Sequence, residues 1–256
     1  INVDAKYCKE IAKKSNIDIL TYGKDAKLKI SSIVPTLNGT KFKIVYNEKT
    51  YAVSSNLIGE HNVYNMVMAI GCLLDLGFNI SEILQTIKEC EFTIPGRFNK
   101  LKIPASFNVV VDYAHTPDGI KNILSAIKTL NVNRVITVFG CGGNRDKTKR
   151  SEMGEVASSM SDYVIVTSDN PRDENPEFII DDIVSGLEGK NITRITDRKS
   201  AIEYALSIAK ENDIVAILGK GAEMYQEIKG IKHHFSDYEV VDNYFKYIVK
   251  ETIKVW

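Results

Sequence analysis

The sequence is poor in cysteine and has no paired cysteine motif. Its four cysteines, Cys8, Cys72, Cys90 and Cys141, show no Cys-x-x-Cys spacing. No positively charged segment followed by an apolar run opens the chain. These absences argue against a zinc site built on cysteine, a secreted disulfide framework and a signal peptide. A reducing cytoplasm is the compartment that we expect.

The sequence also lacks an excess of charge of either sign and lacks a long hydrophobic run. Lys and Arg number 33, and Asp and Glu also number 33. No long-range field therefore draws the chain to nucleic acid or to an anionic membrane. The most apolar stretch, around Met66–Leu76, is too short to span a bilayer. We expect no nucleic-acid partner and no membrane insertion.

Hydrophobic patterning divides the 256 residues into two regions of different texture. Lys27–Ile33, Lys41–Tyr46 and Tyr51–Val53 alternate apolar and polar residues, which predicts an antiparallel meander. Helical spacing follows over Asn62–Leu76 and Ser81–Cys90, with Gly77 closing the first helix and Ser81 a candidate N-cap of the second.

The second region alternates short apolar strands with amphipathic helices, the pattern of a mostly parallel sheet covered on both faces. The expected strands are Asn108–Asp112, Arg134–Phe139, Tyr163–Thr167, Ile192–Thr196 and Ile214–Leu218. The expected helices are Ile120–Leu130, Glu152–Ser159, Glu177–Leu187, Ser200–Lys210 and Val240–Lys250. The fold class is therefore α/β, with a smaller domain over residues 1–102 and a Rossmann-like, doubly wound domain over residues 103–256.

Polar, glycine-rich or proline-containing segments follow four of these strands. They are Asp112–Pro117, Gly140–Arg150, Asp169–Arg172 and Gly219–Glu223. Ligands of open α/β sheets bind at the carboxyl ends of the strands, so we expect one continuous site along this edge.

Within this edge, Asp169-Asn170-Pro171-Arg172 places a guanidinium and an amide on a proline-stiffened turn, which suits a ligand carboxylate. Glu223 could hold a ligand ammonium. The Asp169–Arg172 turn and Glu223 together would then recognise a zwitterion, a ligand that carries both a carboxylate and an ammonium. A polar surface turn and a carboxylate that complements a helix dipole remain open alternatives.

Other motifs are less specific. Gly140–Gly143 is not a dinucleotide fingerprint because Arg145 replaces the third glycine, and Gly219-Lys220-Gly221 lacks the remainder of a Walker motif. Asp112 could accept hydrogen bonds from ribose hydroxyls, and the alternative is that Asp112 or Thr116 only caps the following helix. Asn62 also has a structural alternative to a binding role, because it could be the N-cap of the helix that it opens. His233 and His234 are adjacent, so we assign no metal to them.

Taken together, these motifs resemble the Mur ligase family. Six motifs occur in the order seen in that family, and together they cover nearly the whole chain. They are Gly59-x-x-Asn62-Val63-x-Asn65, Gly96-Arg97, Asp112-Tyr113-Ala114-His115-Thr116-Pro117, Gly140-x-Gly142-Gly143-x-Arg145, Asp169-Asn170-Pro171-Arg172 and Gly219-Lys220-Gly221-x-Glu223. Asp-Asn-Pro-Arg marks the branch of this family that adds meso-diaminopimelate. Ala222 departs from the pattern, since many members have histidine there.

The resemblance implies an ATP-dependent ligase of peptidoglycan precursor synthesis. In that family ATP and Mg²⁺ activate UDP-MurNAc-L-Ala-D-Glu as an acyl phosphate, which the diaminopimelate amine attacks. By resemblance, the amino acid site comprises Arg145, Asn170, Arg172, Gly219 and Glu223, shaped by Asp169 and Pro171. The implied nucleotide contacts are Asn62, Asn65, Arg97, Asp112 and His115. No residue of the chain is implied as a nucleophile or a metal ligand.

The sequence contains no Walker A motif, which the family uses to hold the ATP phosphates. The chain, which begins at Ile1, therefore resembles the end of the central domain followed by the carboxy-terminal domain, and we expect it to be inactive alone. Three alternatives remain: a lysine-adding ligase, a folylpolyglutamate or cyanophycin synthetase relative, and a truncated amino-acid-binding module.

Overall fold

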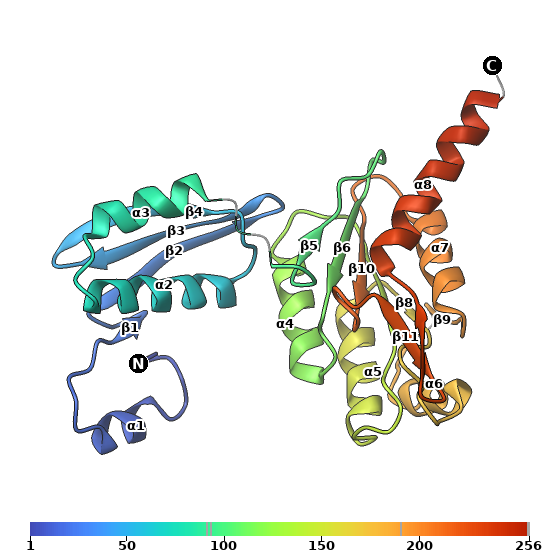
Figure 1. Ribbon diagram of the computed structural model, residues 1–256, viewed down its shortest axis with the longest axis horizontal. Coiled ribbons are helices and arrows are strands. Elements are labelled where there is room, and N and C mark those ends of the chain that lie inside the picture. The colour runs from blue at the N-terminus through green and yellow to red at the C-terminus, as the bar shows by residue number, and fades with distance from the viewer. Residues whose placement is uncertain (91, 93, 190, 255–256) are drawn as a thin grey trace. The chain divides into compact units, whose positions relative to one another are not determined.

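A computed structural model describes residues 1–90, 92, 94–189 and 191–254 (Figure 1). Residue contacts divide the chain into two compact units, Ile1–Thr93 and Ile94–Trp256. The division falls before the boundary near residue 102 that the sequence suggested. The reason is β5 (Asn99–Lys100), a short strand that pairs antiparallel with β6 (Asn108–Asp112) inside the second unit.

The first unit is a small sheet with two helices packed on one face. The sheet order is β1-β2-β3-β4, and β2, β3 and β4 pair antiparallel as expected. The strands are β1 (Tyr22–Gly23), β2 (Leu28–Thr36), β3 (Gly39–Tyr46) and β4 (Lys49–Ser55), and the helices are α1 (Cys8–Lys14), α2 (Glu60–Asp75) and α3 (Ile80–Glu89). Alternate strand residues such as Leu28, Ile30, Phe42 and Ile44 are buried against apolar residues of α2 and α3.

The second unit is a six-stranded sheet of order β5-β6-β10-β7-β8-β9, parallel except for β5. Its further strands are β7 (Val135–Phe139), β8 (Tyr163–Val166), β9 (Ile192–Arg194) and β10 (Ile214–Leu218), and its helices are α4 (Pro117–Lys128), α5 (Lys149–Met160), α6 (Pro176–Val184), α7 (Arg198–Ile208) and α8 (Asp237–Lys254). All residues of β7 and β10 are buried, as expected for strands covered on both faces. Helices α7 and α8 cover one face, and α4, α5 and α6 pack side by side on the other (Figure 1).

Two helix starts differ from the sequence prediction. Helix α2 begins at Glu60, so Asn62 lies in its first turn and is not its N-cap. Helix α3 is capped by Asn79, whose side chain accepts a bond from the Ser81 backbone N–H; the prediction of Ser81 as the cap was wrong. Gly77, with φ of 88°, follows the end of α2 as expected.

A hairpin after β10 was not anticipated. Strands β11 (Tyr225–Ile228) and β12 (Ile231–His234) pair antiparallel, and a bridge joins Arg172 to Ile228. Apolar and polar residues do not alternate strongly in this segment, so the two strands are recognised only by their pairing in the tertiary structure. None of the helices in the described part of the chain combines the length and the apolar content needed to cross a bilayer.

Candidate functional site

The loops that follow β7, β8 and β10 meet at one edge of the sheet in the second unit. Strand β10 lies between β6 and β7, and β8 is the neighbour of β7. The Gly219 N–H donates to the Asp112 carbonyl at 3.0 Å, and the Gly143 N–H donates to the Asn170 carbonyl at 2.8 Å. Parallel pairing thus brings the four polar segments identified in the sequence to a common rim.

The glycines after β7 let their loop lie directly on the Asp169–Arg172 turn. A Cβ atom at Gly143 would stand 1.9 Å from the Pro171 carbonyl oxygen, and one at Gly140 would stand 2.2 Å from the Thr167 carbonyl oxygen. Neither position can accept a side chain without a backbone shift. The glycine-rich composition is therefore explained by close packing against the turn that carries Arg172.

Asn170, Glu223 and Lys220 form a hydrogen-bonded cluster. Asn170 Nδ2 donates to Glu223 Oε2 at 2.9 Å, and Lys220 Nζ donates to Asn170 Oδ1 and to Glu223 Oε2, both at 3.1 Å. The Glu227 N–H also donates to Asn170 Oδ1 at 2.9 Å. Because two donors point at Oδ1, the amide orientation of Asn170 is fixed. The structure therefore brings Asn170 and Glu223, which the sequence interpretation placed on one rim, into direct contact.

Lys220 was missed by the sequence interpretation. Its side chain is fully buried, with Nζ 5.6 Å from the centre of the Tyr225 ring. A buried ammonium needs an anionic or hydrogen-bonding partner, and Asn170 and Glu223 supply both. The signal in the sequence was the position of Lys220 three residues before Glu223. The sequence interpretation compared this lysine only with that of a Walker motif.

Arg172 is held in a defined position beside this cluster. Its Nη1 donates to the Gly143 carbonyl at 2.8 Å, and its Nε donates to Glu227 Oε2 at 3.1 Å. The backbone at Arg172 has a φ of 52°, stabilised by a bond from its N–H to the Glu227 carbonyl. Arg145 is exposed and forms no salt bridge with the described residues, and both arginines flank Gly142.

Asp169 and Pro171 are buried in the turn. Burial raises the pKa of the Asp169 carboxyl, against the opposing charges of Arg198 and Lys220. Asp169 Oδ2 lies 2.8 Å from the place where a Cβ of Gly219 would stand, and Gly219 has a φ of 113°. Asp169, Pro171 and Gly219 therefore lie in the tightly packed backbone of the rim.

A second charged network braces the loop after β7. Buried Arg150 donates to both oxygens of Glu174 at 2.9 and 3.0 Å and to Asp182 at 2.8 Å. The Asn144 N–H also donates to Glu174. The hydrogen bonds from Arg150 are the main cause that lowers the pKa of Glu174 to about 2. This network fixes the arginine-bearing loop relative to the Asp169–Arg172 turn.

Two of the residues implied as nucleotide contacts lie against the Tyr113 ring, and a third, Asp112, precedes it in the chain. The Arg97 guanidinium lies over the Tyr113 ring at 4.9 Å, and the His115 ring meets its edge at 4.6 Å. Arg97 and His115 are exposed. Asp112 is buried, and its two oxygens accept the backbone N–H groups of Phe98 and Ala114. Asp112 thus shapes the loop, and Thr116 caps α4 through the Gly119 N–H.

Asn62 and Asn65 lie in the first unit, on α2. The Asn62 side chain is buried, and its Nδ2 donates to the Ile58 carbonyl at 2.8 Å. Asn65 is exposed on the same helix. The Asn62 side chain is therefore committed to the local backbone, whereas the Asn65 side chain lies exposed on the helix surface.

Both units match models of one family. Residues 96–221 match the Mur ligase glutamate ligase domain, and residues 1–73 match the Mur ligase middle domain. The chain belongs to the Mur ligase family. The mixed α/β architecture that we predicted is confirmed by this match and by solved structures of the family.

The similar proteins carry one name repeatedly. The UDP-N-acetylmuramoyl-L-alanyl-D-glutamate–2,6-diaminopimelate ligase of Aquifex aeolicus is 46% identical over 242 residues, covering 94% of this chain and 50% of that protein. The ligase of the same name from Bacillus cereus is 41% identical and matches 94% of this chain and 49% of its own length. The chain spans about half the length of these curated relatives.

Solved structures agree with the fold. A 2,6-diaminopimelate ligase structure has a TM-score of 0.69 and 35% identity, and covers 97% of this chain and 53% of its own. A MurF ligase from Thermotoga maritima in complex with ADP has a TM-score of 0.65 at 16% identity, matching 96% of this chain and 52% of its own, which shows a shared fold alone.

Proposed function

We propose that this chain is the amino-acid-selecting part of an ATP-dependent ligase that adds meso-diaminopimelate to UDP-MurNAc-L-Ala-D-Glu. The observation that carries the proposal is the Asn170–Glu223–Lys220 cluster beside Arg172. An anchored carboxylate and an anchored guanidinium on one rim suit a ligand that has both charges at one end.

Meso-diaminopimelate has an amino acid group at each end. The end remote from the reacting amine offers a carboxylate to Arg172 and Arg145 and an ammonium to Glu223. Lysine has no remote carboxylate, so a lysine substrate would leave the two guanidinium groups without an anionic partner. This difference supports diaminopimelate over the lysine-adding alternative.

The chain's own contribution to the reaction would be binding and orientation. Bound ATP would supply the phosphoryl group that activates the glutamate carboxyl. We assign the exposed side chains of Arg97, His115 and Asn65 to contacts with the nucleotide. Asp112 and Asn62 would hold the local backbone. The cation over the Tyr113 ring fits a contact with an anionic nucleotide. We assign no Mg²⁺ ligand to this chain. The cysteine spacing supports a cytoplasmic location.

Isothermal titration calorimetry of the chain with meso-diaminopimelate and with L-lysine tests the proposal. We expect saturable binding of the first and no measurable binding of the second. Equal binding of both would overturn the selectivity, and binding of neither would remove the amino acid site. Mixing the chain with ATP and both substrates should give no tripeptide, because the Walker A motif is absent from its sequence.

A further inference from the structure

Glu227, on β11, contacts the turn that carries Asn170 and Arg172 at three points. Its N–H donates to Asn170 Oδ1 at 2.9 Å, its carbonyl accepts the Arg172 N–H at 3.0 Å, and its Oε2 accepts Arg172 Nε at 3.1 Å. The bridge from Arg172 to Ile228 and a bond from the Lys229 N–H to the Arg172 carbonyl at 2.8 Å extend this pairing. Strand β11 is therefore joined to the turn by its backbone, and the Glu227 side chain adds a contact with the guanidinium.

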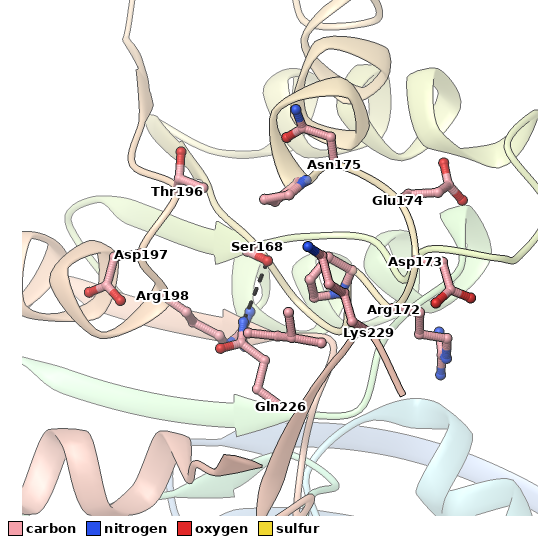
Figure 2. Close-up of a pocket in the computed structure, with 13 residues that line it drawn as sticks. Ser168, Arg172, Asp173, Glu174, Asn175, Thr196, Asp197, Arg198, Gln226 and Lys229 are labelled. Carbon is pink, nitrogen blue, oxygen red and sulfur yellow. Dashed lines mark hydrogen bonds between the residues drawn. The ribbon is translucent and has the colours of Figure 1, made fainter. Parts of the chain in front are cut away.

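The alternation of side chains along β11 explains which residue reaches the arginine. Successive side chains of a strand point to opposite faces. Gln226 Nε2 donates to the Asp169 carbonyl at 2.7 Å and to Ser168 Oγ at 3.4 Å. Figure 2 shows this contact with Ser168, and it shows the Arg172 guanidinium directed away from it. Gln226 thus holds the backbone of the turn, whereas the next residue, Glu227, meets the guanidinium.

The guanidinium of Arg172 keeps unused donors after these contacts. Its Nε is taken by Glu227, and one N–H of Nη1 is taken by the Gly143 carbonyl at 2.8 Å. Nη2 has no hydrogen-bond partner in the described part of the chain. The Arg172 side chain is 19% exposed, so a ligand can approach it from solvent. The remaining N–H groups of Nη1 and Nη2 can bind a carboxylate through two parallel bonds.

The Glu227 carboxylate has two opposite effects on such a ligand. As a negative charge beside Arg172, it would oppose the binding of an anion. As an acceptor for Nε, it restricts the guanidinium before the ligand arrives, and an arginine side chain otherwise loses much rotamer freedom on binding. The backbone at Arg172 also has a φ of 52°, a conformation that persists only where its surroundings hold it. Pre-organisation of this kind improves affinity because less freedom is lost on binding.

We propose that Glu227 is a positioning residue of the amino acid site. Its carboxylate orients the Arg172 guanidinium and leaves Nη1 and Nη2 to the ligand carboxylate, while its N–H orients Asn170 beside Glu223. One residue of β11 thereby fixes the carboxylate-binding part of the rim relative to the ammonium-binding part. The inference rests on the proposed function, since it takes the remote end of meso-diaminopimelate as the ligand of Arg172 and Glu223.

Calorimetric titration with meso-diaminopimelate tests this role through two substitutions. Glu227→Ala removes the acceptor of Arg172 Nε and keeps the backbone contacts, so it should weaken binding about tenfold. Glu227→Gln retains an oxygen that can accept the same N–H, so its affinity should stay within about threefold of that of the unaltered chain. If the negative charge of Glu227 governed binding, both variants would bind more tightly. That result, or an unchanged affinity in Glu227→Ala, would overturn the inference.

A double-mutant cycle separates positioning of Arg172 from a general loosening of β11. In an Arg172→Ala background, Glu227→Ala should weaken binding by less than about twofold, because its effect passes through the missing guanidinium. Equal weakening in both backgrounds would show that Glu227 only stabilises the strand, and it would overturn the inference. If the double variant binds too weakly to measure, the contrast between Glu227→Ala and Glu227→Gln decides.

Glu239→Ala is the matched control. It removes an exposed pair that joins α8 to the same hairpin, in which His234 Nε2 lies 2.7 Å from Glu239 Oε2, and it should leave the affinity unchanged. Glu227→Val, which suits a strand, replaces Glu227→Ala if that variant does not fold. Failure of the unaltered chain to bind meso-diaminopimelate would remove the proposed site and this inference together. Binding by the unaltered chain with an unchanged affinity in Glu227→Ala would remove this inference alone.

Discussion

Asn170 Nδ2 lies 2.9 Å from Glu223 Oε2, although the two residues are 53 positions apart in the sequence. Lys220 and the Glu227 N–H both donate to Asn170 Oδ1, so the amide cannot turn over without leaving two donors unpaired. Glu223 is thereby held in a defined position on the rim, where the proposed function requires it to accept a ligand ammonium.

Lys220→Met should weaken binding of meso-diaminopimelate about tenfold and lower the free energy of unfolding by about 1–3 kcal/mol, because Asn170 Oδ1 and Glu223 lose a buried charged donor. Calorimetry and urea unfolding measure the two effects. Lys232→Met, which removes an exposed lysine packed on the same Tyr225 ring, is the control and should change neither. A folded Lys220→Met chain with unaltered affinity would show that Lys220 does not position the site.

Arg172→Ala should weaken binding of meso-diaminopimelate by about 2 kcal/mol or more, since a charge-assisted bond to a carboxylate is lost. In the complete enzyme the same change should raise the Michaelis constant for diaminopimelate. Arg194→Ala removes an exposed arginine that pairs with Glu177 and Asp181 and should leave that constant unchanged. An unchanged constant in Arg172→Ala would remove Arg172 from the site.

Gly143→Ala should destabilise the second unit by about 1–3 kcal/mol, as expected when an added atom overfills a packed contact. The new Cβ would stand 1.9 Å from the Pro171 carbonyl oxygen, a backbone atom that cannot rotate away. Gly71→Ala is the control, because its Cβ would meet only the methyl groups of Leu20 at 3.3 Å and Leu28 at 3.7 Å, which are the ends of flexible side chains. Thermal unfolding of both variants measures the difference, and equal melting temperatures would contradict this account of the loop.

Asp237→Ala should destabilise the chain by about 3–5 kcal/mol, because Arg198 would be left as a buried charge without its partner. Both side chains of this pair are fully buried. Asp242→Ala, also on α8, removes an exposed pair with Lys246 and should cost less than about 1 kcal/mol. Similar unfolding midpoints for the two variants would show that the buried pair is not a major stabilising contact.

Acid should destabilise the second unit through Glu174. Its pKa in the folded chain is about 2, below the ordinary value near 4.3 for an unfolded chain. A lowered pKa means that the stabilisation is complete above the unfolded value and is lost as pH falls from about 4.3 toward 2. Glu174→Gln should flatten the pH dependence of unfolding in this window. Glu177→Gln, at an exposed carboxylate, serves as the control, and parallel pH profiles for Glu174→Gln and the unaltered chain would contradict the assignment.

Much of the fold was predictable because its signals are local. The apolar run Asn108–Asp112 and the Ile214–Leu218 run coincide with β6 and β10 as they stand in the structure, and the even spacing of helices between strands indicated a parallel sheet. The helix start at Asn79 and the hairpin β11–β12 were not predictable in the same way. An N-cap depends on which side chain reaches the next free N–H, and the hairpin depends on pairing with Arg172.

The sequence by itself determined which chemical groups gather at the rim, since each polar segment follows a strand and parallel strands end at a common edge. Only the tertiary structure decided what each group does there. It committed Asp112 to the backbone N–H groups of Phe98 and Ala114, and it brought Lys220 between Asn170 and Glu223. The place of a residue in the sequence shows which strand end it follows. Hydrogen bonds between residues remote in sequence arise only when the sheet has assembled.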